Sequence, residues 1–275
     1  MPWPLLQPYF GDWLLDYGST SAATGRDMAD AELLTIVAAT FIIAGFVKGV
    51  IGLGLPTVSL ALLTLILGLK EAMALMLIPS FVTNVWQGVI GGHFVSMLKR
   101  LWLLLLASLP AIWIGAGVVA RADALVMAGV LGVMLFIYAA LALWRVQIPE
   151  PGAREKWMSP AIGAITGIFT GLTGSFVMPA VLYMQALGLT RNELVQAMGI
   201  SFSLSTLALG LALAGHSLLP TNLSAISAAA LVPSIAGMML GAWVRNRLSE
   251  DMFRKIFFTA LLALGAWLAL RPIIF

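Results

Sequence analysis

Lys48 is the one charged residue that lies well inside an apolar stretch of this chain. An ammonium group enclosed by apolar residues is costly and by default suggests a functional role. The alternative is a lysine that extends along the apolar surface until its ammonium reaches water. Because Lys48 lies deep in its stretch and directly before a Gly-rich segment, we expect it to supply positive charge to a bound anion.

Two Gly-rich segments interrupt the apolar pattern. The sequence GVIGLGLP covers Gly49–Pro56, and GLTGSFVMP covers Gly171–Pro179. A break of this kind frees backbone N–H groups, and the helix that restarts after it presents a partly positive end. Two such breaks that meet near the membrane midplane would form a small anion pocket, to which the hydroxyls of Thr170, Thr173 and Ser175 add donors. The alternative is close helix packing, which small residues also serve.

Asn84 lies in another apolar run, and it can either bind substrate or bridge two helices, as can Gln87, Gln185 and Gln196. No catalytic residue, metal site or cofactor is expected. The predicted substrate-binding residues are Lys48, Gly49, Gly52, Gly54, Asn84, Thr170, Gly171, Thr173, Gly174 and Ser175.

The elements that position these residues follow from composition. Apolar residues make up 61% of the 275 and charged residues 10%, whereas a soluble domain carries roughly a quarter charged residues. The chain has no Cys, which removes thiolate chemistry, and no G-x-x-x-x-G-K-[ST] loop for a nucleotide. His93 and His216 fall at the ends of apolar runs, so neither a metal centre nor an activated serine is expected. We predict an all-α polytopic membrane protein that is not an enzyme.

Charges, Pro and Gly clusters divide the chain. We expect an acidic N-terminal tail at 1–32, a first transmembrane repeat at 33–146, a linker at 147–159 and a second repeat at 160–275. The second membrane segment of each half is short for a crossing, which needs about 20 residues. The expected segments are 33–53, 55–69, 72–92, 99–120, 124–144, 160–176, 178–189, 193–214, 219–243 and 252–271.

The two halves repeat the same features in the same order. Gly45 matches Gly167, and Pro110, which precedes Gly115 and Gly117, matches Pro233, which precedes Gly237 and Gly241. With five crossings per half and the N-terminus outside, ten Lys and Arg residues are cytoplasmic and four are external, as the positive-inside rule requires. An odd number of crossings inverts one half relative to the other. Two inverted-topology repeats of about five transmembrane segments each, with Gly/Pro-interrupted helices, are typical of secondary transporters.

This pattern resembles the TauE/SafE family of bacterial inner-membrane permeases, the sulfite or organosulfonate exporters. Gly45, Gly49, Gly52, Gly54 and Pro56 carry the resemblance in the first half, followed by Leu-Gly-Leu at 67–69. Gly167, Gly171, Gly174 and Pro179, followed by Leu-Gly-Leu at 187–189, carry it in the second half. The resemblance covers roughly 35–270 and implies small sulfur-containing anions as substrates.

The sequence therefore predicts a secondary exporter of small anions, sulfite or organosulfonates, that works by alternating access. A passive anion channel and a non-transporting membrane assembly factor are the alternatives. The expected partners are a small inorganic or organic sulfur-containing anion and the lipid bilayer, without nucleic acid, and a homo-oligomer stays open. The expected location is the bacterial inner membrane, with both termini periplasmic.

Overall fold

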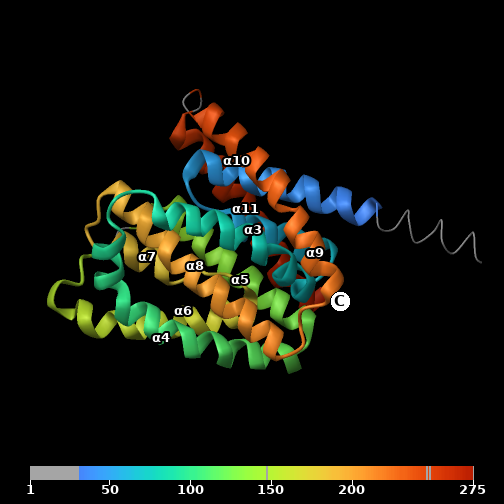
Figure 1. The fold of residues 1–275 in the computed structure, drawn as a ribbon, viewed down its shortest axis with the longest axis horizontal. Helices are drawn as coiled ribbons and strands as arrows, with labels where there is room; N and C mark the ends of the chain where they lie inside the picture. The colour runs from blue at the N-terminus through green and yellow to red at the C-terminus, as the bar shows by residue number, and fades with distance from the viewer. Residues whose placement is uncertain (1–30, 147, 246, 248, 275) are drawn as a thin grey trace, which may run out of the picture.

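The computed structural model describes residues 31–146, 148–245, 247 and 249–274, and the regular elements in that part are all helices (Figure 1). The acidic tail lies outside the described residues up to residue 30. The expectation of an all-α protein is confirmed for the part of the chain that the structure describes.

The helices follow the expected order along the chain. In the first half they are an unlabelled helix at Ala31–Ile51, α2 (Leu55–Ile66), α3 (Leu69–Val89), α4 (Phe94–Arg121) and α5 (Ala124–Leu143). In the second half they are the short η1 (Gly152–Arg154), α6 (Glu155–Thr173), α7 (Ala180–Gln185), α8 (Arg191–Gly215), α9 (Thr221–Ala229), α10 (Leu231–Arg245) and α11 (Glu250–Ile274).

Seven helices in the described residues are long and apolar enough to cross a bilayer, which confirms the membrane class. They are Ala31–Ile51, Leu69–Val89, Phe94–Arg121, Ala124–Leu143, Arg191–Gly215, Asp251–Ile274 and the continuous span Leu223–Arg245, which contains most of α9 and all of α10. The second helix of each half is short, as the sequence indicates: α2 has 12 residues and α7 only 6. A six-residue helix rises about 9 Å, so α7 by itself does not span a hydrocarbon core of about 30 Å.

Helices α4, α6 and α7 differ from the expected segments by four or five residues at one end, and another expected segment is divided: α4 begins at Phe94 and α7 ends at Gln185. Helix α6 begins at Glu155, inside the expected linker, and Pro160 is accommodated within it. The segment expected at 219–243 is divided into α9 and α10, which meet at Ala230. Pro233 explains the division, because it has no N–H group to donate to the carbonyl of Ala229, four residues earlier.

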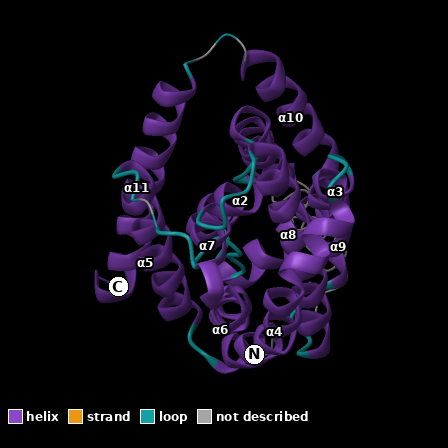
Figure 2. Ribbon diagram, turned by 90° about the vertical axis from the view of Figure 1, so that its left-hand side faces the viewer, coloured by secondary structure: helices purple, strands orange, loops and turns teal. Residues whose placement is uncertain are grey.

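The long helices pack in four main pairs. Helix α4 lies along α6, α3 against α8, and α5 against α11 (Figures 1 and 2). The fourth pair is the Ala31–Ile51 helix with α10. Their backbones touch so closely that a Cβ atom at Gly45 would lie 2.2 Å from the carbonyl oxygen of Ser234. Each pair joins one helix of the first half to one of the second, so the two halves share a single core.

The small residues in two of these pairs repeat. A Cβ atom at Gly115 of α4 would lie 2.3 Å from the carbonyl oxygen of Ile168 in α6. A Cβ atom at Gly241 of α10 would lie 2.2 Å from the carbonyl oxygen of Phe46 in the first helix. Gly115 and Gly241 therefore make the same kind of contact, whereas the sequence comparison pairs Gly115 with Gly237. The sequence alignment of α4 with α10 is therefore wrong by one helical turn, because a row of Gly and Ala residues matches itself at several shifts.

Helix ends gather at two ends of the molecule. We call the end that carries Arg100, Arg145, Arg191 and Arg254 the basic end. The Ala31–Ile51 helix and α5 finish at the basic end, whereas α8 and α11 begin there, because one cavity is lined by all four. At the opposite end, Arg271 near the end of α11 donates to the carbonyl oxygen of Leu65 in α2 at 3.2 Å, and Trp113 of α4 lies beside His216.

Candidate functional site

Lys48 lies in the last turn and a half of the first helix and is buried, with 4% of its surface exposed. Its ammonium donates to the hydroxyl of Thr83 at 3.0 Å and to Oδ1 of Asn84. The Thr83 hydroxyl in turn donates a hydrogen bond to the carbonyl oxygen of Pro79 at 2.7 Å. Lys48 and Asn84, predicted as site residues from separate segments, are thus in direct contact, and Thr83 is a neighbour that the sequence did not single out.

This cluster has donors to spare and no negative charge. An ammonium has three N–H donors, of which two are used here. The Nδ2 atom of Asn84 is buried and has no partner among the described residues. In the described part of the chain the ion pairs are Arg100–Glu155 and Arg145–Asp251, so no carboxylate pairs with Lys48. A buried ammonium beside an unused amide donor is an environment that an anion would complete.

The two Gly-rich breaks have the expected local form. The first helix ends at Ile51, and Gly52 and Gly54 take positive φ angles of 81° and 111° before α2 restarts at Leu55. The second break begins at Gly174, with φ 74°, after which residues 175–179 are irregular until α7. Positive φ angles are easily reached only by glycine, so Gly52 and Gly174 fix where a helix stops, and Gly54 fixes where α2 begins.

The breaks contact different neighbours. A Cβ atom at Gly52 would lie 4.0 Å from Val195 of α8, and one at Gly54 would lie 3.7 Å from Phe257 of α11. A Cβ atom at Gly174 would lie 2.9 Å from Met73 and 3.1 Å from Leu60. The first half of α2, from Leu55 to Leu60, therefore connects one break to the other.

The hydroxyls of the second break are turned onto their own backbone. Thr170 donates to the carbonyl oxygen of Ser175 at 3.2 Å, and Thr173 donates to that of Phe169 at 2.7 Å. The N–H of Ser175 donates to the hydroxyl of Thr173 at 3.3 Å. A threonine has one hydroxyl hydrogen, so in this conformation Thr170 and Thr173 stabilise the break instead of donating to a ligand.

Gly49 and Gly171 lie at helix contacts. A Cβ atom at Gly49 would lie 2.3 Å from the carbonyl oxygen of Met238, and one at Gly171 would lie 2.2 Å from that of Ile112. The packing alternative for small residues therefore describes these two positions. Gln87 and Gln196 also bridge helices: Gln87 donates to the carbonyl oxygen of Val195 and Gln196 to that of Gly88, both at 2.9 Å.

A cavity of about 370 Å³ opens at the basic end, close to the first break. Ile51 and Leu53 of the break line it, as do Arg145, Arg191 and Arg254. Lys48 is not in its wall but precedes Ile51 by three residues, which is about one helical turn. The sequence counted these arginines as loop charges that orient the chain, and no local pattern indicated that three helix ends bring them together.

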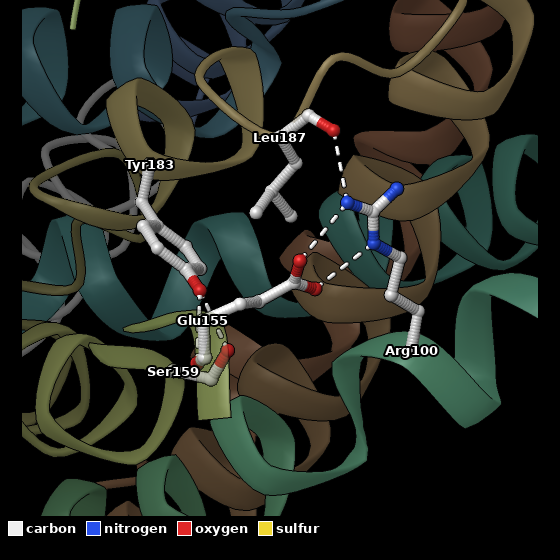
Figure 3. A network of polar contacts seen from close by, with 5 residues as sticks. All are labelled: Arg100, Glu155, Ser159, Tyr183 and Leu187. Atoms are coloured by element: carbon white, nitrogen blue, oxygen red, sulfur yellow. Dashed lines mark hydrogen bonds and ion pairs between the residues drawn. The ribbon is translucent and has the colours of Figure 1, made fainter. Parts of the chain in front are cut away.

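At the basic end of the molecule, a polar network connects α4, α6 and α7 (Figure 3). Arg100 forms two hydrogen bonds with the carboxylate of Glu155, at 2.9 and 3.0 Å, and donates to the carbonyl oxygen of Leu187 at 2.9 Å. The hydroxyls of Tyr183 and Ser159 lie 2.7 Å apart. The network ties α7 back to the start of α6, so the segment after the second break returns to the basic end.

A family model described as Sulfite exporter TauE/SafE matches residues 37–268. This range contains Lys48, Asn84, both breaks and all three arginines of the cavity. No curated protein and no solved structure matches the chain.

Proposed function

Because the chain belongs to the sulfite exporter TauE/SafE family, we propose that this multi-pass membrane protein exports a small anion, sulfite or an organosulfonate, by alternating access. One observation carries the proposal: the buried Lys48 ammonium lies beside the unpartnered Nδ2 of Asn84, with no carboxylate paired to it. Secondary transport is proposed because no nucleotide-binding loop occurs in the sequence.

The substrate site combines these two donors with the first break. Lys48 supplies the charge, Asn84 supplies an amide N–H, and Gly52 and Gly54 leave the backbone before α2 open to close approach. The start of α2 adds its unpaired N–H groups and the positive end of its dipole. Ser175 belongs to the second break, which the first half of α2 connects to the first break.

Inverted repeats would supply the two alternating conformations. The support is that corresponding helices run in opposite directions: the Ala31–Ile51 helix finishes at the basic end, whereas α6 begins there with Glu155 bound to Arg100. In the same way α5 finishes and α11 begins at that end. Such an arrangement allows one bundle to rock against the other around a fixed site.

The basic end is proposed to face the cytoplasm. It gathers Arg100, Arg145, Arg191 and Arg254, as the positive-inside rule requires of cytoplasmic loops. Both termini then lie on the periplasmic side of a bacterial inner membrane.

The proposal is tested by transport in proteoliposomes with sulfite and small alkanesulfonates as probes. We expect saturable uptake and counterflow, whereas flux that rises linearly with concentration and shows no counterflow would identify a channel. Lys48→Met should lower the apparent affinity about tenfold to a hundredfold, since hydrogen bonds to charged groups contribute about 1.5–3 kcal/mol. Lys99→Met, at an exposed lysine, is the control. Equal transport by Lys48→Met and wild type would exclude Lys48 from the site.

A further inference from the structure

Among the described residues, the wall of the cavity at the basic end contains three arginines and no carboxylate. Arg145 and Arg254 line both this cavity and a neighbouring opening that contains Asp251, and Arg191 lines the first. Three guanidinium groups thus face a single carboxylate among the side chains that line the two openings. Each guanidinium has five N–H donors. Arg145 donates to Asp251 at 2.5 Å and Arg254 to the carbonyl oxygen of Ala142 at 3.1 Å, which leaves most of the N–H donors of these two residues for a ligand.

The ends of the helices hold these arginines in place. Arg145 follows α5 with a φ of 51°, and the N–H groups of Arg145 and Val146 bind the carbonyl oxygens of Ala142 and Leu141. This pair of bonds is a Schellman motif, which closes the end of a helix in a defined shape. Arg191 opens α8 directly after its Thr190 cap, and Arg254 lies in the second turn of α11.

The rest of the wall is mainly apolar. Leu53, Leu141, Leu182, Met198 and Phe258 line the same cavity as the arginines. A volume of about 370 Å³ lies in the range of small-molecule pockets, about 300–1,000 Å³, and is far more than a four-atom oxyanion fills. The cavity therefore matches a ligand with an anionic head and an apolar body.

We propose that this cavity is a second anion site, separate from the Lys48–Asn84 cluster, which takes organic anions with an apolar tail. The oxyanion head meets Arg145, Arg191 and Arg254, and the tail packs on the leucine, methionine and phenylalanine side chains. The site captures the anion one helical turn from Lys48. The proposal rests on the proposed function in one respect, namely that the captured anion is the one transported.

The test is calorimetric titration of the purified protein with a series of sulfonates from methanesulfonate to hexanesulfonate. The titrated protein carries Lys48→Met, which removes anion binding at the Lys48–Asn84 cluster. We expect the affinity to rise about threefold to fourfold per methylene, the effect of burying one CH₂ group. Chain-length-independent binding would overturn the proposal.

Two substitutions at one ion pair separate ligand binding from a structural role. Arg145→Gln and Asp251→Asn both break the same exposed contact, so a structural role would make them act alike. If Arg145 binds the head group, Arg145→Gln lowers the affinity for hexanesulfonate about tenfold, and Asp251→Asn leaves it equal or higher. A shift of both variants in the same direction would overturn the proposal. Absence of wild-type transport with these binding results intact would instead overturn the proposed function.

Discussion

At the scale of the residue, the environment of each cation decides its role. Lys48 is enclosed, and its ammonium donates to the neutral oxygens of Thr83 and Asn84, so its charge is not neutralised inside the described part of the protein. Arg100 instead has a carboxylate partner and a carbonyl partner, which is the pattern of a structural cation. The difference between the two is the missing carboxylate beside Lys48, which an anionic substrate would replace.

Asn84→Asp tests this reasoning directly. The new carboxylate would lie against the Lys48 ammonium and neutralise it, so we expect the ligand-free protein to melt at the same temperature or higher. The affinity for sulfite or a sulfonate should fall at least tenfold further than in Asn84→Leu. The leucine variant loses a neutral donor, a change of about 0.5–1.5 kcal/mol. Affinity is measured by ligand-induced thermal shift, and equal losses in the two variants would contradict the role given to Lys48.

At the scale of the element, glycines have two different structural roles. Gly52 and Gly174 end helices through positive φ angles, whereas Gly115 and Gly171 allow backbones to touch. The sequence shows all four as Gly in Gly-rich segments. The two roles can be told apart only from the φ angle of each glycine and from the atoms that a Cβ at that position would meet.

Two glycines of α4 make a matched pair for this distinction. A Cβ atom at Gly115 would lie 2.3 Å from the backbone oxygen of Ile168, whereas one at Gly117 would lie 3.4 Å from the ring of His216. Gly115→Ala should therefore destabilise the protein by about 1–3 kcal/mol, as overpacking does. Gly117→Ala should be neutral or stabilising by up to about 1 kcal/mol, because alanine favours the helix. Thermal unfolding in detergent measures both, and equal melting temperatures would refute the proposed close contact.

At the scale of the whole molecule, polarity is arranged for a membrane. Large apolar side chains such as Trp86, Ile114 and Val232 are exposed, while Lys48 and Gln196 are among the buried polar ones. This arrangement suits a surrounding of lipid, in which polar groups find partners only inside the protein. The charged helix ends at the two ends of the molecule complete the pattern.

The orientation of the molecule can be measured because the chain has no Cys, so any introduced thiol is the only one. We expect Lys99→Cys, at the start of α4, to be protected from a membrane-impermeant maleimide in intact cells. Arg121→Cys, at the end of the same helix, should be labelled. Disrupting the cells should make both thiols reactive, which serves as the control. Labelling of Lys99→Cys alone would reverse the proposed orientation.

The sequence by itself determined the membrane class, most helix boundaries to within a turn, both Gly-rich breaks and the position of Lys48 as a charge inside an apolar run. These are local properties, since hydropathy, Gly and Pro act within one or two helical turns. The division at Ala230, the start of α6 and the true register of Gly115 with Gly241 were not determined, because caps and packing shift helix ends and because small-residue stripes match at several registers.

The tertiary structure decided which polar groups are neighbours. It placed Thr83 and Asn84 against Lys48, directed Thr170 and Thr173 onto their own backbone, and brought Arg145, Arg191 and Arg254 around one cavity. The physical reason is that the rotation of a membrane helix about its axis is set by packing against neighbouring helices. A polar residue in an apolar run therefore has a known depth but an unknown partner until the helices are assembled.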